Sequence, residues 1–344
     1  METSLSHAYL NNVWYQAGWS HELDQGPLCR TLLGIPLFLY RTDAQQIAAL
    51  HDRCPHRFAP LSAGRLNGGI VTCGYHGLAF DAAGTCVRNP HGPVTRAMRV
   101  RSFAAVERHQ ALWIWFGSGE ARPERIPDLS FIDATPQSAR ITSYMSVAAH
   151  YQLLTDNIMD LSHADYLHPA TLGGMMTGAK TSVTAQGEQI KVVWNSLNCD
   201  APPAFHAMVP PPAKADIWTQ VVWSAPAVMV LGTAAMPAGV PRSDADEAYT
   251  LHNMSPETDT TSHYFMCSTR RFLMDNREFS TMLRATLTQA FEQEDKPMLE
   301  KQQQRIGTRD FWSLEPVLLG IDTAAVQVRR ALDRLIANET ESRP

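Results

Sequence analysis

The chain has 344 residues, which is enough for two domains, and its 44% hydrophobic and 18% charged residues are ordinary for a globular protein with a sizeable core. These proportions exclude a disordered chain, a collagen-like fibre and a coiled coil. The 29 Lys and Arg against 34 Asp and Glu give a net charge of −5. No basic block predicts binding to nucleic acid.

Neither a signal peptide nor a membrane-spanning helix is expected. Residues 1–19 lack a basic region followed by an apolar one, and the most apolar stretch, 225–240, is interrupted by prolines and glycines. Six cysteines are too few for a disulfide scaffold. We therefore expect a cytoplasmic protein with reduced thiols, in which clustered Cys and His are first considered as metal ligands.

The order of the segments predicts an α+β protein with two domains. Residues 1–120 contain short runs of β-branched and aromatic residues separated by turn residues, which predicts an all-β domain. Residues 121–137 are polar and proline-containing, as in a linker. Residues 138–344 mix strand-like runs with apolar residues at helical spacing, which predicts helices at 151–163, 278–302 and about 322–338.

Two Cys/His pairs in the first domain predict a metal site. Cys54 and His56 form one pair, and Cys73 and His76 form the other. Zinc sites commonly pair Cys with Cys and His with His, whereas a Rieske [2Fe–2S] cluster binds one iron with two thiolates and the other with two imidazoles. Because each pair is mixed, the spacing favours a Rieske cluster; zinc and incidental core residues are the alternatives.

A second group of metal-binding side chains lies in the predicted helix 151–163. On a helix, Asp160 and His163 share one face with Asp156. His168 would point elsewhere, but Pro169 disfavours helical geometry at the preceding residue, so the chain can turn His168 back toward His163. The spacing predicts that two imidazoles bind one metal ion.

A carboxylate on the apolar stripe of the predicted helix 278–302 is the candidate third ligand. Asp295 lies on this stripe, where a charge is costly unless it is paired or bound to metal, and Pro297 is expected to break the helix just beyond it. Two histidines and one carboxylate form the triad of mononuclear Fe(II) oxygenases. Glu294 is the alternative ligand, and a solvated charge run over 292–295 is the non-functional interpretation.

Four segments together resemble the Rieske non-haem iron oxygenases, and the resemblance covers nearly the whole chain. They are CPHRFAPLSAG (54–64), CGYHGLAFD (73–81), DNIMDLSHADYLHPATLG (156–173) and FEQEDKPMLE (291–300). The resemblance implies that His163, His168 and Asp295 bind iron, in a catalytic domain whose antiparallel sheet is flanked by helices in a helix-grip-like arrangement.

The resemblance also implies how the two iron sites cooperate. The cluster of one subunit passes electrons to the iron of the next subunit in a head-to-tail trimer. Asp160 is the residue expected to bridge His163 and the His76 of the neighbouring subunit. Asn157, one turn earlier, is expected to contact the iron or its water, and a helix-packing amide is the alternative. His252 lies in a segment similar to a substrate-pocket strand, and a core histidine is the alternative.

The closest resemblance is to vanillate O-demethylase, toluenesulfonate methyl-monooxygenase and dicamba O-demethylase. It implies hydroxylation of a methyl or methoxy group on an aromatic acid, with electrons from a separate NADH-dependent reductase that carries flavin and a [2Fe–2S] cluster. The absence of a nucleotide-binding glycine motif agrees with a separate reductase. Ring dihydroxylation, N-demethylation and a non-catalytic Rieske electron carrier with a ligand-binding domain are the alternatives.

Overall fold

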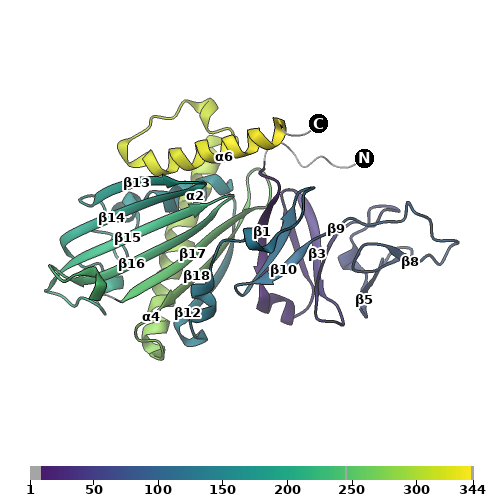
Figure 1. Ribbon diagram of the computed structural model, residues 1–344, viewed down its shortest axis with the longest axis horizontal. Coiled ribbons are helices and arrows are strands. Elements are labelled where there is room, and N and C mark those ends of the chain that lie inside the picture. Colours follow the sequence, from purple (N-terminus) through teal and green to yellow (C-terminus); the bar gives the residue numbers. More distant parts are fainter. Residues whose placement is uncertain (1–8, 245, 342–344) are drawn as a thin grey trace. The chain divides into compact units, whose positions relative to one another are not determined.

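The computed structural model describes residues 9–244 and 246–341, in two compact units that divide after Ile126 (Figure 1). Residues 1–8, part of the segment in which no signal peptide is expected, lie outside the described residues. The predicted linker 121–137 spans the division between the units. Within the described ranges, no helix is both long enough and apolar enough to cross a membrane.

The first unit is an all-β domain, as the sequence predicts. Its strands are β1 (Val13–Trp19), β2 (Leu28–Leu32), β3 (Ile35–Arg41), β4 (Ile47–His51), β5 (Arg65–Asn67), β6 (Ile70–Thr72), β7 (Ala79–Phe80), β8 (Cys86–Arg88), β9 (Ser102–Phe103), β10 (Ala105–Arg108) and β11 (Ala111–Phe116). They form antiparallel sheets in the orders β1-β11-β10, β2-β3-β4-β9 and β5-β6-β7-β8. The two Cys/His loops connect β4 to β5 and β6 to β7, so the third sheet supports both.

The second unit is built on a seven-stranded antiparallel sheet in the order β12-β18-β17-β16-β15-β14-β13. The strands are β12 (Arg140–Val147), β13 (Lys180–Gln186), β14 (Gln189–Asp200), β15 (Lys214–Ser224), β16 (Val228–Pro237), β17 (Glu247–Pro256) and β18 (Ser262–Arg270). Every residue of β18 is buried, which shows that this part of the sheet is covered on both faces.

Helices pack on this sheet, which confirms the predicted α+β class. They are α1 (Ser130–Ala134), α2 (Tyr151–Met159), α3 (Ala164–Leu167), α4 (Arg277–Thr288), α5 (Lys296–Ile306) and α6 (Thr323–Glu341). Helix α2 contacts β15 and β17, α5 and α6 contact α2, and α6 runs along β14 (Figure 1). The apolar face of α2, with Leu154 and Ile158, is buried by these contacts.

Two helix predictions differ from the structure. The predicted helix 151–163 ends at Met159, because Asp160 adopts an extended conformation and its carboxylate caps the 3₁₀ turn 161–163. The predicted break at Pro297 is also wrong. Pro297 lies in the first turn of α5, where a proline is tolerated, and the irregularity precedes it as a π-helical segment, Gln289–Asp295.

Candidate metal centres and substrate cavity

The two Cys/His loops of the first unit have the same backbone hydrogen bonds. The Cys54 N–H donates to Ala59 O and the Cys73 N–H to Leu78 O. Each cysteine carbonyl then accepts from the residue four positions later, Phe58 or Gly77, and both of these residues have positive φ. A left-handed residue closes each loop, which explains the glycine in one of them.

These loops bring the four predicted cluster ligands together. Cys54 and Cys73 are buried and contact each other, and burial raises the pKa of the Cys54 thiol to about 11. The rings of His56 and His76 lie 4.5 Å apart between centroids, with His56 exposed. Two buried thiols and two more exposed imidazoles fit the unequal irons of a Rieske cluster, in which one iron has two sulfur and the other two nitrogen ligands from the protein.

The second unit brings His163, His168 and Asp295 together. One ligand atom from each of these residues lies within 4.8 Å of the others. His163 ends the 3₁₀ turn, His168 follows α3, and Asp295 ends the π-helical segment. Asp295 Oδ1 lies 3.5 Å from His163 Nε2 and 3.2 Å from His168 Nε2. Asn157 also contacts Asp295, although the two residues are 138 positions apart in the sequence.

The local sequence explains how these side chains converge. His168 lies just beyond α3 with φ −119° and ψ 42°, which is outside the α-helical region that a following proline disfavours. The π-helical segment widens the helix before Asp295 and changes the direction in which that side chain points. Glu292 and Gln293 are exposed whereas Asp295 is 2% exposed, so the charge run is solvated only in its first part.

Two further side chains contact this cluster. Glu294 Oε2 lies 2.7 Å from His168 Nδ1, which leaves His168 Nε2 directed at Asp295. Gln289 donates to the other Glu294 oxygen. The Asn157 amide lies 3.3 Å from His163 Nε2 and 3.1 Å from Asp295 Oδ1. Burial lowers the pKa of His168, but hydrogen bonds and charges of Asp295 and Glu294 outweigh burial and raise the pKa overall.

The donor set fits a mononuclear iron. Oδ2 of Asp295 is buried and has no hydrogen-bond partner among the described residues, which is costly for a carboxylate unless a cation binds there. Two imidazole nitrogens and one carboxylate oxygen are the donors of the Fe(II) facial triad. Glu294, whose carboxylate already binds His168 Nδ1, is placed to orient that ring, an arrangement common around metal-binding histidines.

Two acidic residues of the predicted helix face do not reach this cluster through their carboxylates. His163 Nδ1 contacts the backbone carbonyl of Asp160 at 2.7 Å, while the Asp160 carboxylate accepts from the N–H and hydroxyl of Ser162. The helix ends before Asp160, so its carboxylate caps the next turn instead of facing His163. Asp156 binds Arg329, which is 4% exposed, and is not one of the three residues whose ligand atoms converge.

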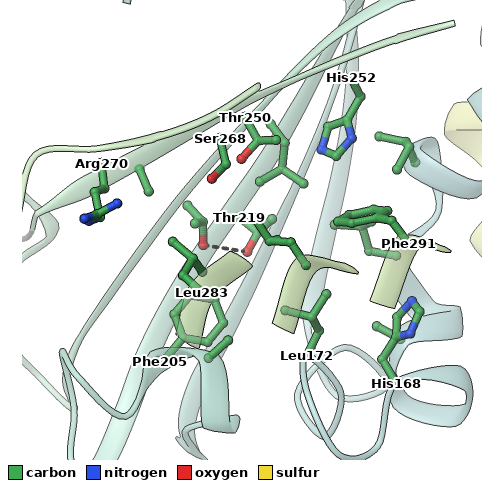
Figure 2. A pocket seen from close by; sticks show the side chains of 18 of the residues that line it. His168, Leu172, Phe205, Thr219, Thr250, His252, Ser268, Arg270, Leu283 and Phe291 are labelled. Carbon is green, nitrogen blue, oxygen red and sulfur yellow. Dashed lines mark hydrogen bonds between the residues drawn. The ribbon is translucent and has the colours of Figure 1, made fainter. Parts of the chain in front are cut away.

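A cavity of about 150 Å³ extends from this cluster along the sheet (Figure 2). Figure 2 shows His168 at one end and Arg270 at the other, with His252 and Phe291 on the side nearer His168. Apolar side chains form much of the remaining wall: Ile158, Leu161, Leu172, Phe205, Leu283 and Leu287. An apolar cavity with few polar groups, open to a metal cluster, is the usual form of a small-molecule site.

His252, the sequence-predicted substrate contact, lines this cavity. It is 1% exposed, and burial lowers the pKa of His252 to about 3, so the ring is neutral at physiological pH. Its Nδ1 lies 2.6 Å from the Tyr264 hydroxyl. The sequence did not predict the orienting contact of Glu294 or the place of Arg270 in the cavity. For the role of Glu294, the sequence offered one signal, which is its position beside Asp295.

Comparisons with known proteins confirm the resemblance in both units. A model of the Rieske [2Fe-2S] domain matches residues 13–103, and one of the vanillate O-demethylase oxygenase C-terminal domain matches residues 147–338. The oxygenase component of dicamba O-demethylase from Stenotrophomonas maltophilia is 37% identical over 95% of this chain and 98% of its own. The oxygenase component of chloroacetanilide N-alkylformylase from Rhizorhabdus wittichii is 35% identical over 98% of this chain and 97% of its own.

The fold agrees with these relationships. The crystal structure of dicamba monooxygenase bound to 3,6-dichlorosalicylic acid matches with a TM-score of 0.89 and 35% sequence identity. The match covers 97% of this chain and 99% of that chain.

Proposed function

Since this chain belongs to the Rieske oxygenases with a vanillate O-demethylase type of catalytic domain, we propose that it hydroxylates a methyl or methoxy group of an aromatic acid. With a methoxy substrate, the hydroxylated carbon is a hemiacetal that loses formaldehyde and leaves a phenol. The balance is Ar–OCH₃ + O₂ + 2 e⁻ + 2 H⁺ → Ar–OH + CH₂O + H₂O.

One observation carries this proposal: His163, His168 and Asp295 converge at the end of a largely apolar cavity. A metal bound by these three residues would have coordination positions free for O₂, and the cavity would hold the substrate beside it. The crystal structure that matches this chain holds an aromatic acid. When bound, the two iron groups supply the electrons and the O₂ activation that attack on a C–H bond requires.

The residues of this chain have separate tasks in that reaction. We assign Cys54, His56, Cys73 and His76 to the cluster and His163, His168 and Asp295 to the mononuclear iron. Glu294 holds the His168 ring in place, and Asn157 contacts the iron site. The leucine and phenylalanine side chains of the cavity keep water from the reacting methyl group and position the aromatic ring.

The proposal is tested with protein purified anaerobically and assayed with NADH and a surrogate flavin/[2Fe–2S] reductase. We expect a Rieske-type EPR signal, about three iron and two sulfide per chain, and formaldehyde from methoxylated aromatic acids. His163→Ala should keep the cluster signal but lose one iron and all turnover. A His163→Ala variant with unchanged iron content would contradict the oxygenase proposal and favour a Rieske electron carrier.

A second candidate reaction is N-dealkylation at the same iron. The 35% identity to an N-alkylformylase component over nearly the full length favours it over ring dihydroxylation. The two reactions differ in the atom that bears the oxidised carbon, so matched N-methyl and O-methyl substrates distinguish them. Release of formaldehyde from the N-methyl compounds alone would replace the first proposal with this one.

The matched names describe oxygenase components, so the protein works with a separate reductase. We propose that this partner is NADH-dependent and carries flavin and a [2Fe–2S] cluster. We also propose a cytoplasmic location, because the cluster thiols must be reduced when the cluster is inserted.

We further propose a homotrimer in which Asp160, whose backbone carbonyl contacts His163 Nδ1, bridges to the His76 of a neighbour. A second hollow with Asp160 and His163 in its wall supports this assembly. Val317 in the same wall is 87% exposed, and a subunit interface at this hollow would bury that apolar side chain. Light scattering tests the trimer, and a monomeric active holoenzyme would contradict it.

A further inference from the structure

Arg270, at the end of β18, lies in the wall of the substrate cavity and is 2% exposed. Figure 2 shows it at the end of the cavity away from His168. An arginine is seldom fully buried unless a carboxylate pairs with it. No carboxylate within the described residues forms an ion pair with Arg270, so the charge lacks its usual partner.

The protein uses only part of the guanidinium group. Nη2 donates to the Ser280 hydroxyl at 2.6 Å and contacts the carbonyl oxygens of Ser138, Leu273 and Met274 at 3.1 to 3.4 Å. Nε and Nη1 are buried and have no hydrogen-bond partner in the described part of the chain. The neutral contacts at Nη2 hold the guanidinium group in place, while the N–H groups of Nε and Nη1 stay available to an anion.

The strands set the distance between this cation and His252, which Figure 2 shows on the side of the cavity nearer His168. Arg270 pairs with Ala248, and the pair His252–Met266 lies four residues away along the same two strands. At about 3.3 Å per residue this separation is about 13 Å. Between the two ends, Thr250 and Ser268 form a pair that lines the cavity. The nearer histidine, His252, is neutral and supplies no charge for an anion.

We propose that Arg270 binds the anionic group of the substrate, and that this group stands para, not ortho, to the methyl or methoxy group that is oxidised. An ortho anion would lie beside the iron and could not reach Arg270 across the cavity. A para anion spans the ring and places the charge at the far end, where the buried donors are. The position of the oxidised group rests on the proposed function, whereas the binding of an anion at Arg270 does not.

The first experiment needs no variant. Binding of 4-methoxybenzoate and of its neutral counterpart 4-methoxybenzamide to the iron-loaded protein is measured by calorimetry. A hydrogen bond to a buried charge predicts that the acid binds about 10- to 100-fold more tightly. We expect 2-methoxybenzoate to bind at least about 10-fold more weakly than the para isomer. Equal affinities for the acid and the amide would overturn the proposal.

Variants then assign the preference to one residue. Arg270→Met should bring the affinity ratio of acid to amide close to one, and Arg270→Lys should keep part of it because the charge remains. Arg271→Met is the matched control, since Arg271 is adjacent in sequence but exposed, and it should keep the full ratio. If Arg270→Met does not fold, the comparisons in the native protein and in Arg270→Lys still decide. A full ratio in Arg270→Met would overturn the proposal.

Formaldehyde measured on the same samples separates the two proposals. An Arg270-dependent preference for the acid without formaldehyde upholds the anion site and contradicts the proposed reaction. Formaldehyde release combined with equal affinities for the acid and the amide upholds the reaction and overturns the anion site.

Discussion

Removal of the Glu294 carboxylate is expected to weaken iron binding at His163, His168 and Asp295 without disturbing the Rieske cluster. Glu294 Oε2 lies 2.7 Å from Nδ1 of His168, and the His168 side chain is 2% exposed. Glu294→Ala therefore leaves a buried ring nitrogen that water cannot easily reach. The metal-binding ring loses the group that orients it.

The size of the effect follows from this contact. A hydrogen bond to a charged group contributes about 1.5–3 kcal/mol, which corresponds to about 10- to 100-fold in affinity. Losses of the same size are typical when the outer partner of a metal-binding histidine is removed. Glu294→Gln should be intermediate, because its amide oxygen still accepts from Nδ1–H but carries no charge.

The assay is competition for Fe(II) between a chelator and the anaerobically purified protein, with the visible absorbance of the cluster as an internal reference. Glu292→Ala is the matched control, because Glu292 lies in the same π-helical segment but is exposed. An iron affinity in Glu294→Ala equal to that of the native protein would refute the orienting role.

Three further predictions concern other parts of the chain. Arg329→Met should lower the free energy of unfolding of the second unit by about 1.5–3 kcal/mol, since the partly exposed Asp156 carboxylate loses the hydrogen bonds of its cation; calorimetry should show recovery when Asp156→Asn is added, and an unchanged melting temperature would contradict the pairing. Burial lowers the pKa of His150 from 6.5 to about 3, so the unfolded chain binds the proton first and the free energy of unfolding should fall as the pH drops from 6.5 toward 3. Denaturation at several pH values should show that the slope of the unfolding free energy against pH is smaller in His150→Gln than in the native protein, by up to about 1.4 kcal/mol per pH unit. Equal slopes in the two proteins would count against this source of acid sensitivity. Cys73→Ser should lose the Rieske EPR signal but keep about one iron per chain, because the two sites lie in separate compact units; loss of iron from both sites would show that the sites depend on each other.

The sequence alone was sufficient for features whose parts lie close together along the chain. Each cluster loop contains one cysteine and one histidine within a few residues, and the loop is closed by its own backbone hydrogen bonds. The Cys/His spacing therefore indicated a Rieske cluster before any fold was known. The pair His163 and His168 was predictable for the same reason, because a short helix and Pro169 determine their approach locally.

Features that depend on distant segments needed the tertiary structure. Asp295 and Glu294 are neighbours in sequence, and only the π-helical segment shows which carboxylate faces both histidines and which one contacts His168 Nδ1. A hydrophobic pattern read at 3.6 residues per turn does not reveal such a local change of pitch. The end of the helix at Met159 was missed similarly, because the cap formed by Asp160 competes with continuation of the helix.

Arg270 shows most clearly that a feature formed by distant segments cannot be predicted from the sequence. In the sequence it stands beside Arg271 at the end of a strand, where a cation is normally solvated. The carbonyl of Ser138, which precedes β12, and the hydroxyl of Ser280 in α4 meet over its guanidinium and bury it. Burial of a charge is decided by segments far apart in the chain, since each one alone leaves the side chain in water. The sequence therefore determined the chemistry of both metal sites, and only the packing of the second unit decided where a substrate charge can be bound.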